Sequence, residues 1–182
     1  MLFSRTSLKD AMLIRLEMRE DDRGFFARTM CRAEFDANGL VSDFPQSNHS
    51  HNNFKGTMRG MHFQLAPHSE VKLVRCVRGA VYDVIVDLRR HSPTYKCWEG
   101  FELTADNGCS LYVPMGFAHG FVTLSDESDL IYQVSHPYTP SAEGGLRYND
   151  PAISIEWPVK ISLVSPKDAS WPLLTDDDRF FH

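Results

Sequence analysis

The stretch AVYDVIVDL at residues 80–88 decides the fold class of this sequence. Its side chains fall into two alternating sets, Ala80, Tyr82, Val84, Val86 and Leu88 on one parity and Val81, Asp83, Ile85 and Asp87 on the other. This period of two is typical of a β-strand, because successive side chains of a strand point to opposite faces of the sheet. We therefore expect a strand over 80–88.

Similar short runs lie on both sides of this stretch, at 71–77, 98–103, 110–113, 120–124 and 129–135. Turn sequences separate them, among them Arg78-Gly79, His91-Ser92-Pro93 and Asp106-Asn107-Gly108. Strands spaced roughly 8–12 residues apart, with turns between them, predict a β-sandwich or barrel. Long helices do not alternate with the strands, which argues against a parallel α/β sheet.

Helix is expected at only two places. Residues 32–38 could form one or two turns that end at Gly39. A second short helix is predicted to begin after Ser165, because Ser165 suits the N-cap, Pro166 the first helical position and Asp168 the first turn. The acidic run Asp176-Asp177-Asp178 is expected to be a solvated end.

The length of 182 residues suits one domain, and the net charge of −5 argues against a general nucleic-acid binder. No apolar run approaches the roughly 20 residues of a membrane span, and the N-terminal residues have no signal-peptide core. We therefore expect a soluble, cytoplasmic protein.

The four cysteines have no CxxC spacing, which disfavours a zinc knuckle or a redox pair.

Four polar side chains interrupt apolar strand segments, and they are His62, Lys72, His119 and Tyr132. Each has an ordinary structural explanation, such as a hydrogen-bonded histidine, a lysine that protects an edge strand, or a core tyrosine. If all four face one cavity, they provide a base, a phenolic acid and cationic hydrogen-bond donors. That set could remove a proton next to a carbonyl and stabilise the enolate that results.

A metal site is a competing interpretation. His49 and His51 form an HxH pair, but they lie in a polar segment that we interpret as a loop without an obvious third ligand. A further polar group suits a phosphorylated ligand, because arginines such as Arg23 and Arg59 bind phosphate with two donors. For each arginine alone, a surface ion pair is the simpler explanation.

Five motifs stand in one order along the chain, RGMHFQ at 59–64, KLVRCVRG at 72–79, DLRRHSPT at 87–94, VPMGFAHGF at 113–121 and NDP with WP between 149 and 158. In this string the sequence resembles the dTDP-4-dehydrorhamnose 3,5-epimerase family, over about residues 24–168. The resemblance implies an all-β, cupin-type double-stranded β-helix, a jelly-roll barrel that forms one domain over 1–182. It also implies an N-terminal strand region over about 1–50 and a short C-terminal helical segment over about 165–182.

The resemblance implies a substrate and a role for each site residue. The substrate is a nucleotide-diphosphate-linked 4-keto-6-deoxyhexose of deoxysugar and polysaccharide biosynthesis, epimerised at C3, C5 or both. His62 would be the base, oriented by Asp168, and Tyr132 the acid on the opposite face, while Lys72 and His119 would stabilise the enolate. Diphosphate and nucleotide contacts would come from Arg23, Phe26, Arg28, Gln46, Asn48, Arg59, Tyr138, Glu143 and Lys167. The family is usually a homodimer that exchanges N-terminal strands, and its enzymes need no metal or other cofactor.

Arg28 departs from the family pattern, which has a glutamate at this position. A glutamate there would accept the N3–H of thymine, whereas arginine can only donate. Cytosine has an acceptor at N3, so Arg28 raises the hypothesis of a CDP-linked substrate. The alternative is that Arg28 points at phosphate or solvent and that the base is recognised elsewhere.

Two other hypotheses for the function of the whole protein remain. One is a metal-dependent cupin enzyme, such as a dioxygenase or sugar isomerase, and the other is a non-catalytic sugar-binding cupin.

Overall fold

Residues 80–87 form β8 (Ala80–Asp87) in the computed structural model, whose described residues are 1–175, 180 and 181. The strand lies between β9 (Trp98–Thr104) and β11 (Phe117–Thr123), antiparallel to both. Val81 and Ile85 enter one core and Val84 and Val86 a second core on the opposite face. Both sets of the alternating sequence contain apolar side chains because both faces of β8 are covered.

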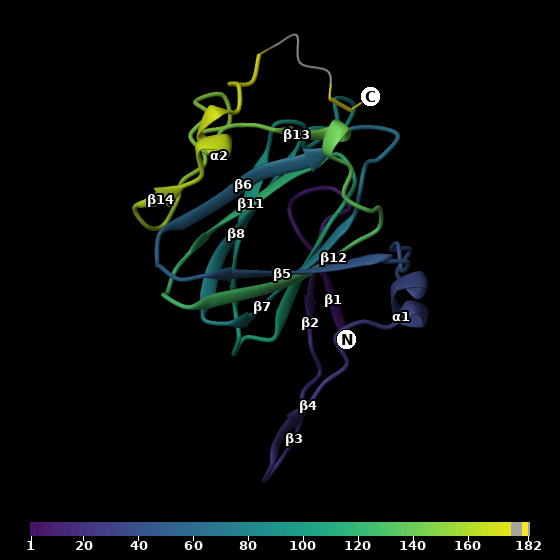
Figure 1. Ribbon diagram of the computed structural model, residues 1–182. Coiled ribbons are helices and arrows are strands. Elements are labelled where there is room, and N and C mark those ends of the chain that lie inside the picture. The colour runs from purple at the N-terminus through teal and green to yellow at the C-terminus, as the bar shows by residue number, and fades with distance from the viewer. Residues whose placement is uncertain (176–179, 182) are drawn as a thin grey trace.

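Two large sheets, packed face to face, make up the body of the molecule (Figure 1). The first has the order β1 (Leu2–Arg5), β2 (Met12–Arg15), β10 (Cys109–Val113), β7 (Lys72–Arg78), β12 (Ser128–Val134) and β5 (Gln46–Asn52). The second has the order β13 (Glu143–Gly145), β6 (Thr57–Gln64), β11, β8 and β9, and β14 (Leu163–Val164) pairs with β6. This confirms the all-β, cupin-type jelly roll.

The second sheet packs against a different part of the chain on each of its two faces. The first core lies between the two sheets, where Val74 and Leu130 of the first sheet meet Ile85 of the second. The second core lies on the other side of the second sheet, where Met61 and Val84 are covered by residues of the C-terminal segment. Burial of each large aliphatic side chain contributes roughly 1.5–3 kcal/mol, so both layers stabilise the second sheet.

The two short helices form where the sequence predicts them. Helix α1 (Arg32–Ala37) is followed by Gly39 at φ +69°, the left-handed conformation that ends many helices. Helix α2 (Pro166–Ser170) begins after Ser165, whose Oγ accepts the Asp168 N–H at 3.0 Å.

The C-terminal helix is shorter than the helical segment predicted over about 165–182. Helix α2 covers five residues and ends before Trp171. Trp171 precedes Pro172, and the ring of a proline disfavours helical geometry in the residue before it. The acidic run Asp176–Asp178 lies outside the described residues. A 3-10 helix, η1 (Pro140–Ala142), is the remaining helical turn in the described part of the chain.

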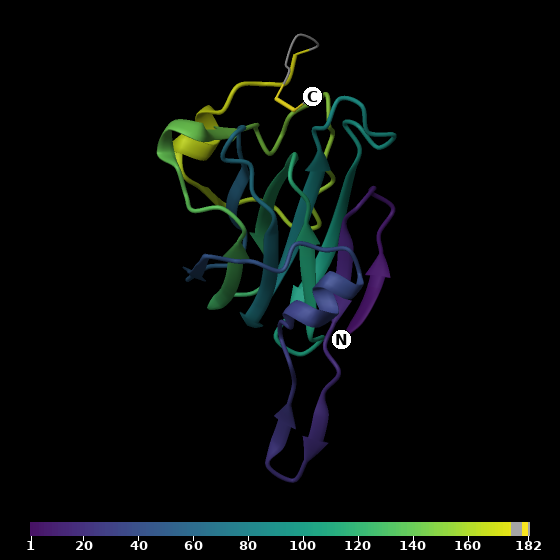
Figure 2. The ribbon, with the colours of Figure 1, turned by 90° about the vertical axis from the view of Figure 1, so that its right-hand side faces the viewer.

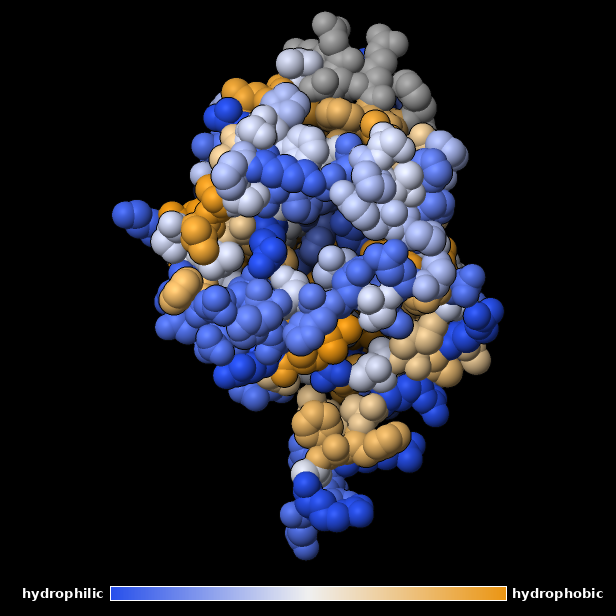
Figure 3. Space-filling model, viewed as in Figure 1, coloured by the Kyte–Doolittle hydropathy of each residue, from blue (hydrophilic) through white to orange (hydrophobic). Residues whose placement is uncertain are grey.

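A hairpin of β3 (Arg19–Asp21) and β4 (Gly24–Phe26) projects from the body of the molecule (Figures 1 and 2). Phe25 and Phe26 on this hairpin are 54% and 73% exposed. Hydrophobic side chains on the projecting segment stand next to hydrophilic ones at its tip (Figure 3). Within the part of the chain that the structure describes, no helix has the length and apolar character needed to cross a membrane.

Candidate active site

The candidate active site is a cavity between the two sheets, with two lobes of about 270 and 310 Å³. Both lobes are lined by His62, Lys72 and Tyr132, so these three side chains stand where the lobes meet. On the face of the molecule between β6 and β5, the surface is hollowed and lined by hydrophilic residues (Figure 3). The structure thus brings His62, Lys72, His119 and Tyr132 to one cavity.

His62 is hydrogen-bonded to a buried carboxylate. Its Nε2 lies 2.7 Å from Oδ1 of Asp168, and the other oxygen of that carboxylate accepts the Gly60 N–H at 3.2 Å. Burial acts to raise the pKa of Asp168, but the hydrogen bonds from His62, Gly60 and Ser165 outweigh it, and the pKa lies below its usual value. Asp168 is therefore the ionised partner that fixes the orientation of the His62 ring.

The C-terminal segment brings Asp168 to His62 although the two residues lie far apart in the chain. Strand β14 runs parallel to β6, with Leu163 opposite Thr57 and Val164 opposite Met58. Helix α2 follows β14 directly and carries Asp168. The parallel pairing thus fixes where α2 begins relative to β6, and it aligns the carboxylate with the histidine.

His119 forms a second pair of histidine and carboxylate. Its Nε2 lies 2.9 and 3.0 Å from the two oxygens of Asp83, a fully buried residue of β8. His119 stands opposite His62 in the register of β11 and β6. A buried carboxylate in the middle of a strand needs a partner. Asp83, which shares one side of the alternating stretch with Val81 and Ile85, therefore indicated a buried polar pair that the sequence analysis did not predict.

Lys72 lies at the start of β7, between β10 and β12 in the middle of the first sheet. The interpretation of Lys72 as a lysine that protects an edge strand is therefore wrong. Its ammonium lies 3.2 Å from Oε1 of Glu70, and the two side chains are 11% and 9% exposed. Sequence reasoning missed Glu70, which lies outside the strands in a segment without a recognisable pattern.

Tyr132 of β12 stands opposite Val74 of β7 and faces the cavity. Burial and the nearby charge of Glu70 raise the pKa of its phenol, and Arg59 opposes them. Arg59 also lines the cavity, and its guanidinium is held by Oδ1 of Asn52 at 2.7 Å and by the His51 carbonyl at 3.2 Å. Asn52 thus fixes the direction of the Arg59 guanidinium at the wall of the cavity.

Five further predicted residues form a chain of hydrogen bonds at the second lobe. Gln46 donates to Asn48 at 2.9 Å and accepts the Tyr138 N–H at 3.0 Å. The Tyr138 hydroxyl donates to Glu143 at 2.9 Å, and the Lys167 ammonium lies 2.6 and 2.7 Å from the same carboxylate. These residues present both donors and acceptors beside the three central side chains.

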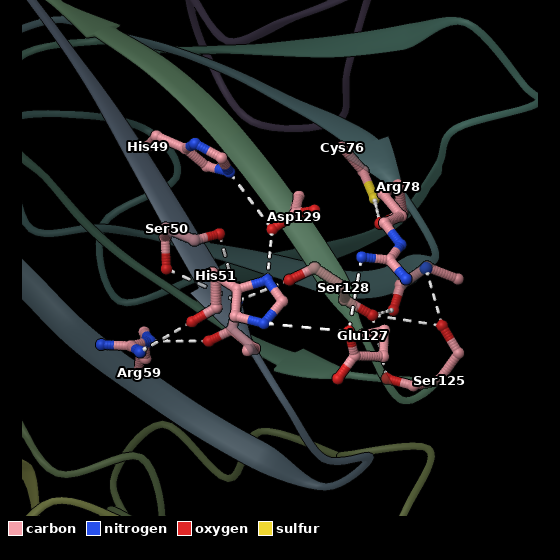
Figure 4. Close-up of polar contacts among 12 residues, drawn as sticks. His49, Ser50, His51, Arg59, Cys76, Arg78, Ser125, Glu127, Ser128 and Asp129 are labelled. Atoms are coloured by element: carbon pink, nitrogen blue, oxygen red, sulfur yellow. Dashed lines mark hydrogen bonds and ion pairs between the residues drawn. The ribbon is translucent and has the colours of Figure 1, made fainter.

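His49 and His51 do not lie in a loop, which corrects the sequence interpretation. Both belong to β5, and both bond Oδ1 of Asp129 on the neighbouring strand, at 3.2 Å from His49 Nε2 and 2.6 Å from His51 Nδ1 (Figure 4). The hydrogen bond to Asp129 raises the pKa of His51. Among the described residues, no three histidine, cysteine or acidic side chains are arranged to hold a metal ion.

Arg23, Phe26 and Arg28 are not brought to this cavity. Arg23 stands on the projecting hairpin and bonds Asp21 at 3.1 Å, and Phe26 is exposed. Arg28 follows the hairpin, and its guanidinium donates to Glu34 at 2.7 Å. The cavity formed by one copy of the chain therefore contains the predicted chemical groups but lacks these three residues, which the sequence predicts to bind the nucleotide and diphosphate.

Comparisons with known proteins agree over almost the whole chain. Residues 5–176 match the family model described as dTDP-4-dehydrorhamnose 3,5-epimerase. An enzyme of that name from Shigella flexneri is 42% identical, covering 97% of both chains. A crystal structure of such an epimerase from Bacillus anthracis, with TDP and PPi bound, has a TM-score of 0.92 and 42% identity over 95% of this chain and 99% of its own.

A dTDP-4-dehydrorhamnose 3-epimerase from Streptomyces niveus is also 42% identical, over 88% of this chain and 77% of that protein. Relatives with this degree of identity over this length share one fold and one general chemistry with the chain. The chain therefore belongs to the dTDP-4-dehydrorhamnose 3,5-epimerase family of isomerases.

Proposed function

We propose that this protein epimerises a dTDP-linked 4-keto-6-deoxyhexose at C3 and C5, in the biosynthesis of a deoxysugar. The observation that carries the proposal is the position of His62, Lys72 and Tyr132 where the two lobes of one cavity meet, with Asp168 bonded to His62. A base, a cation and an acid around one small volume suit a reaction in which a proton leaves a carbon and returns from the other side.

His62 takes the first step of the proposed reaction. The C4 keto group acidifies the neighbouring C–H bonds, and His62 removes the proton from C3 or C5. Because Nε2 is bonded to Asp168, Nδ1 is the nitrogen left to accept it. The electron pair of the C–H bond becomes the enolate π bond, and the carbonyl π electrons move to O4. The ionised Asp168 stabilises the imidazolium that forms.

Lys72 would stabilise the negative charge on O4 by a hydrogen bond from its ammonium. His119 would donate a second one from Nδ1 with both ring nitrogens protonated, because its Nε2 is bonded to Asp83. Each such donor typically contributes about 3 kcal/mol to the transition state, and a positioned base contributes about 10²–10⁴ in rate. Tyr132 then donates its phenolic proton to the opposite face of the same carbon. This proton transfer completes the inversion. Two different residues are needed because one proton leaves from one face of the carbon and the other arrives at the opposite face.

Conversion of the substrate tests this proposal. In the presence of the protein, dTDP-4-keto-6-deoxyglucose should give a new product in which NMR coupling constants show inversion at C3 and C5. Inversion at C3 alone would assign the narrower activity for which the Streptomyces niveus relative is named. Recovery of unchanged substrate with every nucleotide tried would contradict the proposal, and turnover lost on chelation and restored by metal would favour a metal-dependent cupin enzyme.

The choice of nucleotide depends on Arg28. The ion pair between Arg28 and Glu34 gives the guanidinium a partner other than a base, and the relatives compared above are named for dTDP sugars. The names of the relatives support dTDP, and the ion pair weakens the argument from Arg28 for CDP. Comparing kcat/KM for CDP- and dTDP-4-keto-6-deoxyglucose decides the question, and a clear preference for CDP would restore the hypothesis that Arg28 recognises cytosine.

We further propose that the protein acts as a homodimer in which the β3–β4 hairpin of one copy completes the cavity of the other. The hairpin projects, exposes two phenylalanines and carries Arg23 and Phe26, two of the three predicted binding residues that the cavity of its own chain lacks (Figure 2). Mixing two inactive variants, His62→Ala and Arg23→Ala, is the test. A heterodimer would have one site with both residues intact, so random exchange of subunits should restore roughly a quarter of wild-type activity. No recovery after verified exchange would contradict shared sites.

A further inference from the structure

Glu70 has no assigned role, although its side chain is one of the most enclosed ionisable groups that line the cavity. It lies two residues before β7, its side chain is 9% exposed, and it lines the lobe that also contains Lys72 and Tyr132. A carboxylate is costly to bury unless it is paired and hydrogen-bonded. Its position beside the proposed chemical groups therefore calls for a functional explanation.

Both oxygens of the Glu70 carboxylate are held, each by a different sheet. Oε1 lies 3.2 Å from the ammonium of Lys72, which begins β7 in the first sheet. Oε2 accepts from Nε2 of Gln64 at 2.9 Å, at the end of β6 in the second sheet. Gln64 is fixed in turn, because its Oε1 accepts the Thr139 N–H at 2.6 Å. Glu70 thus joins the two sheets and holds the lysine in a defined direction.

The other ionisable groups around the cavity have different partners. His62 on β6 is bonded to Asp168 and His119 on β11 to Asp83, while Glu143 on β13 is bonded to Lys167 and Tyr138. Arg59 on β6 is held by Asn52 and a backbone carbonyl, and His49 and His51 on β5, the strand beside β12, are bonded to Asp129. Among the interactions described for this cavity, Glu70 is the carboxylate paired with Lys72.

Glu70 also acts on Tyr132 through its charge. Burial has the largest effect in raising the pKa of the Tyr132 phenol, the Glu70 charge raises it further, and the Arg59 charge lowers it. A negative charge in this lobe therefore favours the protonated phenol, which is the form that can donate a proton.

We propose that Glu70 is a positioning residue of the site, one that aims the Lys72 ammonium at the reacting oxygen and holds Tyr132 as a proton donor. Glu70 acts through these two side chains and touches neither reacting carbon. The inference rests on the proposed epimerase function, in which Lys72 stabilises the enolate and Tyr132 returns the proton. It adds a residue that couples the two tasks through one carboxylate.

Two substitutions separate the effect of the Glu70 charge from the effect of its side-chain length. Glu70→Gln keeps the size and removes the charge, so the alkaline limb of the pH profile of kcat/KM should move to lower pH. We expect kcat to be about tenfold lower and KM to stay within about threefold of the wild type. Glu70→Asp keeps the charge and shortens the side chain, so kcat should fall while the limb stays in place. A residue with a merely structural role would lower activity at every pH without moving the limb.

Direct titration of Tyr132 provides a second measurement that needs no substrate. In protein labelled with [13Cζ]tyrosine, the Tyr132 signal is assigned by its loss in Tyr132→Phe. It should titrate at lower pH in Glu70→Gln than in the wild type and in Glu70→Asp. Glu70→Met, a second neutral variant of similar length, should behave like Glu70→Gln and replaces it if Glu70→Gln does not fold.

The inference is overturned if the limb and the Tyr132 titration of the neutral variants coincide with those of the wild type. That result would leave the proposed function intact, because wild-type turnover decides the function. Conversely, a wild type without turnover would refute the proposed function, while the substrate-free titration would still report whether Glu70 controls Tyr132.

Discussion

Replacing Asp168 by asparagine removes the negative charge beside the proposed base and one of the two acceptor oxygens of the carboxylate. Asparagine has nearly the same shape, and its amide oxygen can still face His62 Nε2 across the present 2.7 Å. Its NH₂ group then faces the Gly60 N–H, which loses its acceptor. Asp168 is buried and lies at the start of a helix whose cap involves the Asp168 backbone N–H rather than its side chain. The protein should therefore fold, and the change should act on the imidazole.

The size of the effect follows from the loss of a charge-assisted hydrogen bond. Such a bond is worth about 1.5–3 kcal/mol, more than a neutral one, and it strengthens when His62 becomes an imidazolium. Each 1.4 kcal/mol corresponds to a factor of about ten, so kcat should fall about 10- to 100-fold. The fall is larger if the asparagine turns its NH₂ group toward His62, because Nε2 must then accept and Nδ1 is no longer basic.

Steady-state turnover and circular dichroism together measure this effect. We expect a lower kcat with a KM within about threefold of the wild type, because Asp168 touches the base and not the substrate. The folded spectrum should be unchanged. A kcat within threefold of the wild type in a folded Asp168→Asn protein would refute the role of the buried carboxylate.

Three further predictions concern the acid, a buried network and the core. Tyr132→Phe should still exchange the substrate C–H with solvent through His62, but it should form product at least tenfold more slowly. NMR in D₂O measures both rates, and an equal loss of exchange and of product formation would contradict a separate acid and base. Asp87 accepts hydrogen bonds from Arg89, Ser92 and Thr94, which outweigh burial and lower its pKa. Its ionised form therefore stabilises the fold above pH about 4, and this contribution is lost as the pH falls through the lowered pKa. Asp87→Asn should accordingly lose about 2–4 kcal/mol at pH 7 in urea unfolding and depend less on acid, and an unchanged acid dependence would argue against the network. Ile85→Ala should lose about 2–5 kcal/mol because its side chain is fully buried, and a loss below 1 kcal/mol would show that the core there is loosely packed.

The central strands could be predicted because their side chains alternate and their ends carry turn residues. Strand β5 could not, because the sequence QSNHSHN at residues 46–52 has no apolar alternation. Its seven residues pair in register with β12, from Gln46 opposite Val134 to Asn52 opposite Ser128. The neighbouring strand supplies the pairing that local propensity does not indicate, which is why a polar segment was interpreted as a loop.

The site could be predicted in part. His62, Lys72, His119 and Tyr132 were visible as polar interruptions of apolar strands. Which carboxylate meets which base could not be worked out locally, since only the parallel pairing of β14 with β6 brings Asp168 to His62, and that pair rested on the family resemblance. Glu70 had no signal at all, because a glutamate in a loop is usually solvated and only the folded cavity encloses it.

Incorporation of solvent deuterium into dTDP-4-keto-6-deoxyglucose, followed by NMR with wild-type protein and with His62→Ala, tests the proton-transfer mechanism most directly. We predict that the wild type labels C3 and C5 and that His62→Ala labels neither above the rate without protein. Label introduced equally fast by His62→Ala would contradict His62 as the base, and the absence of label with an active wild type would contradict an enolate intermediate.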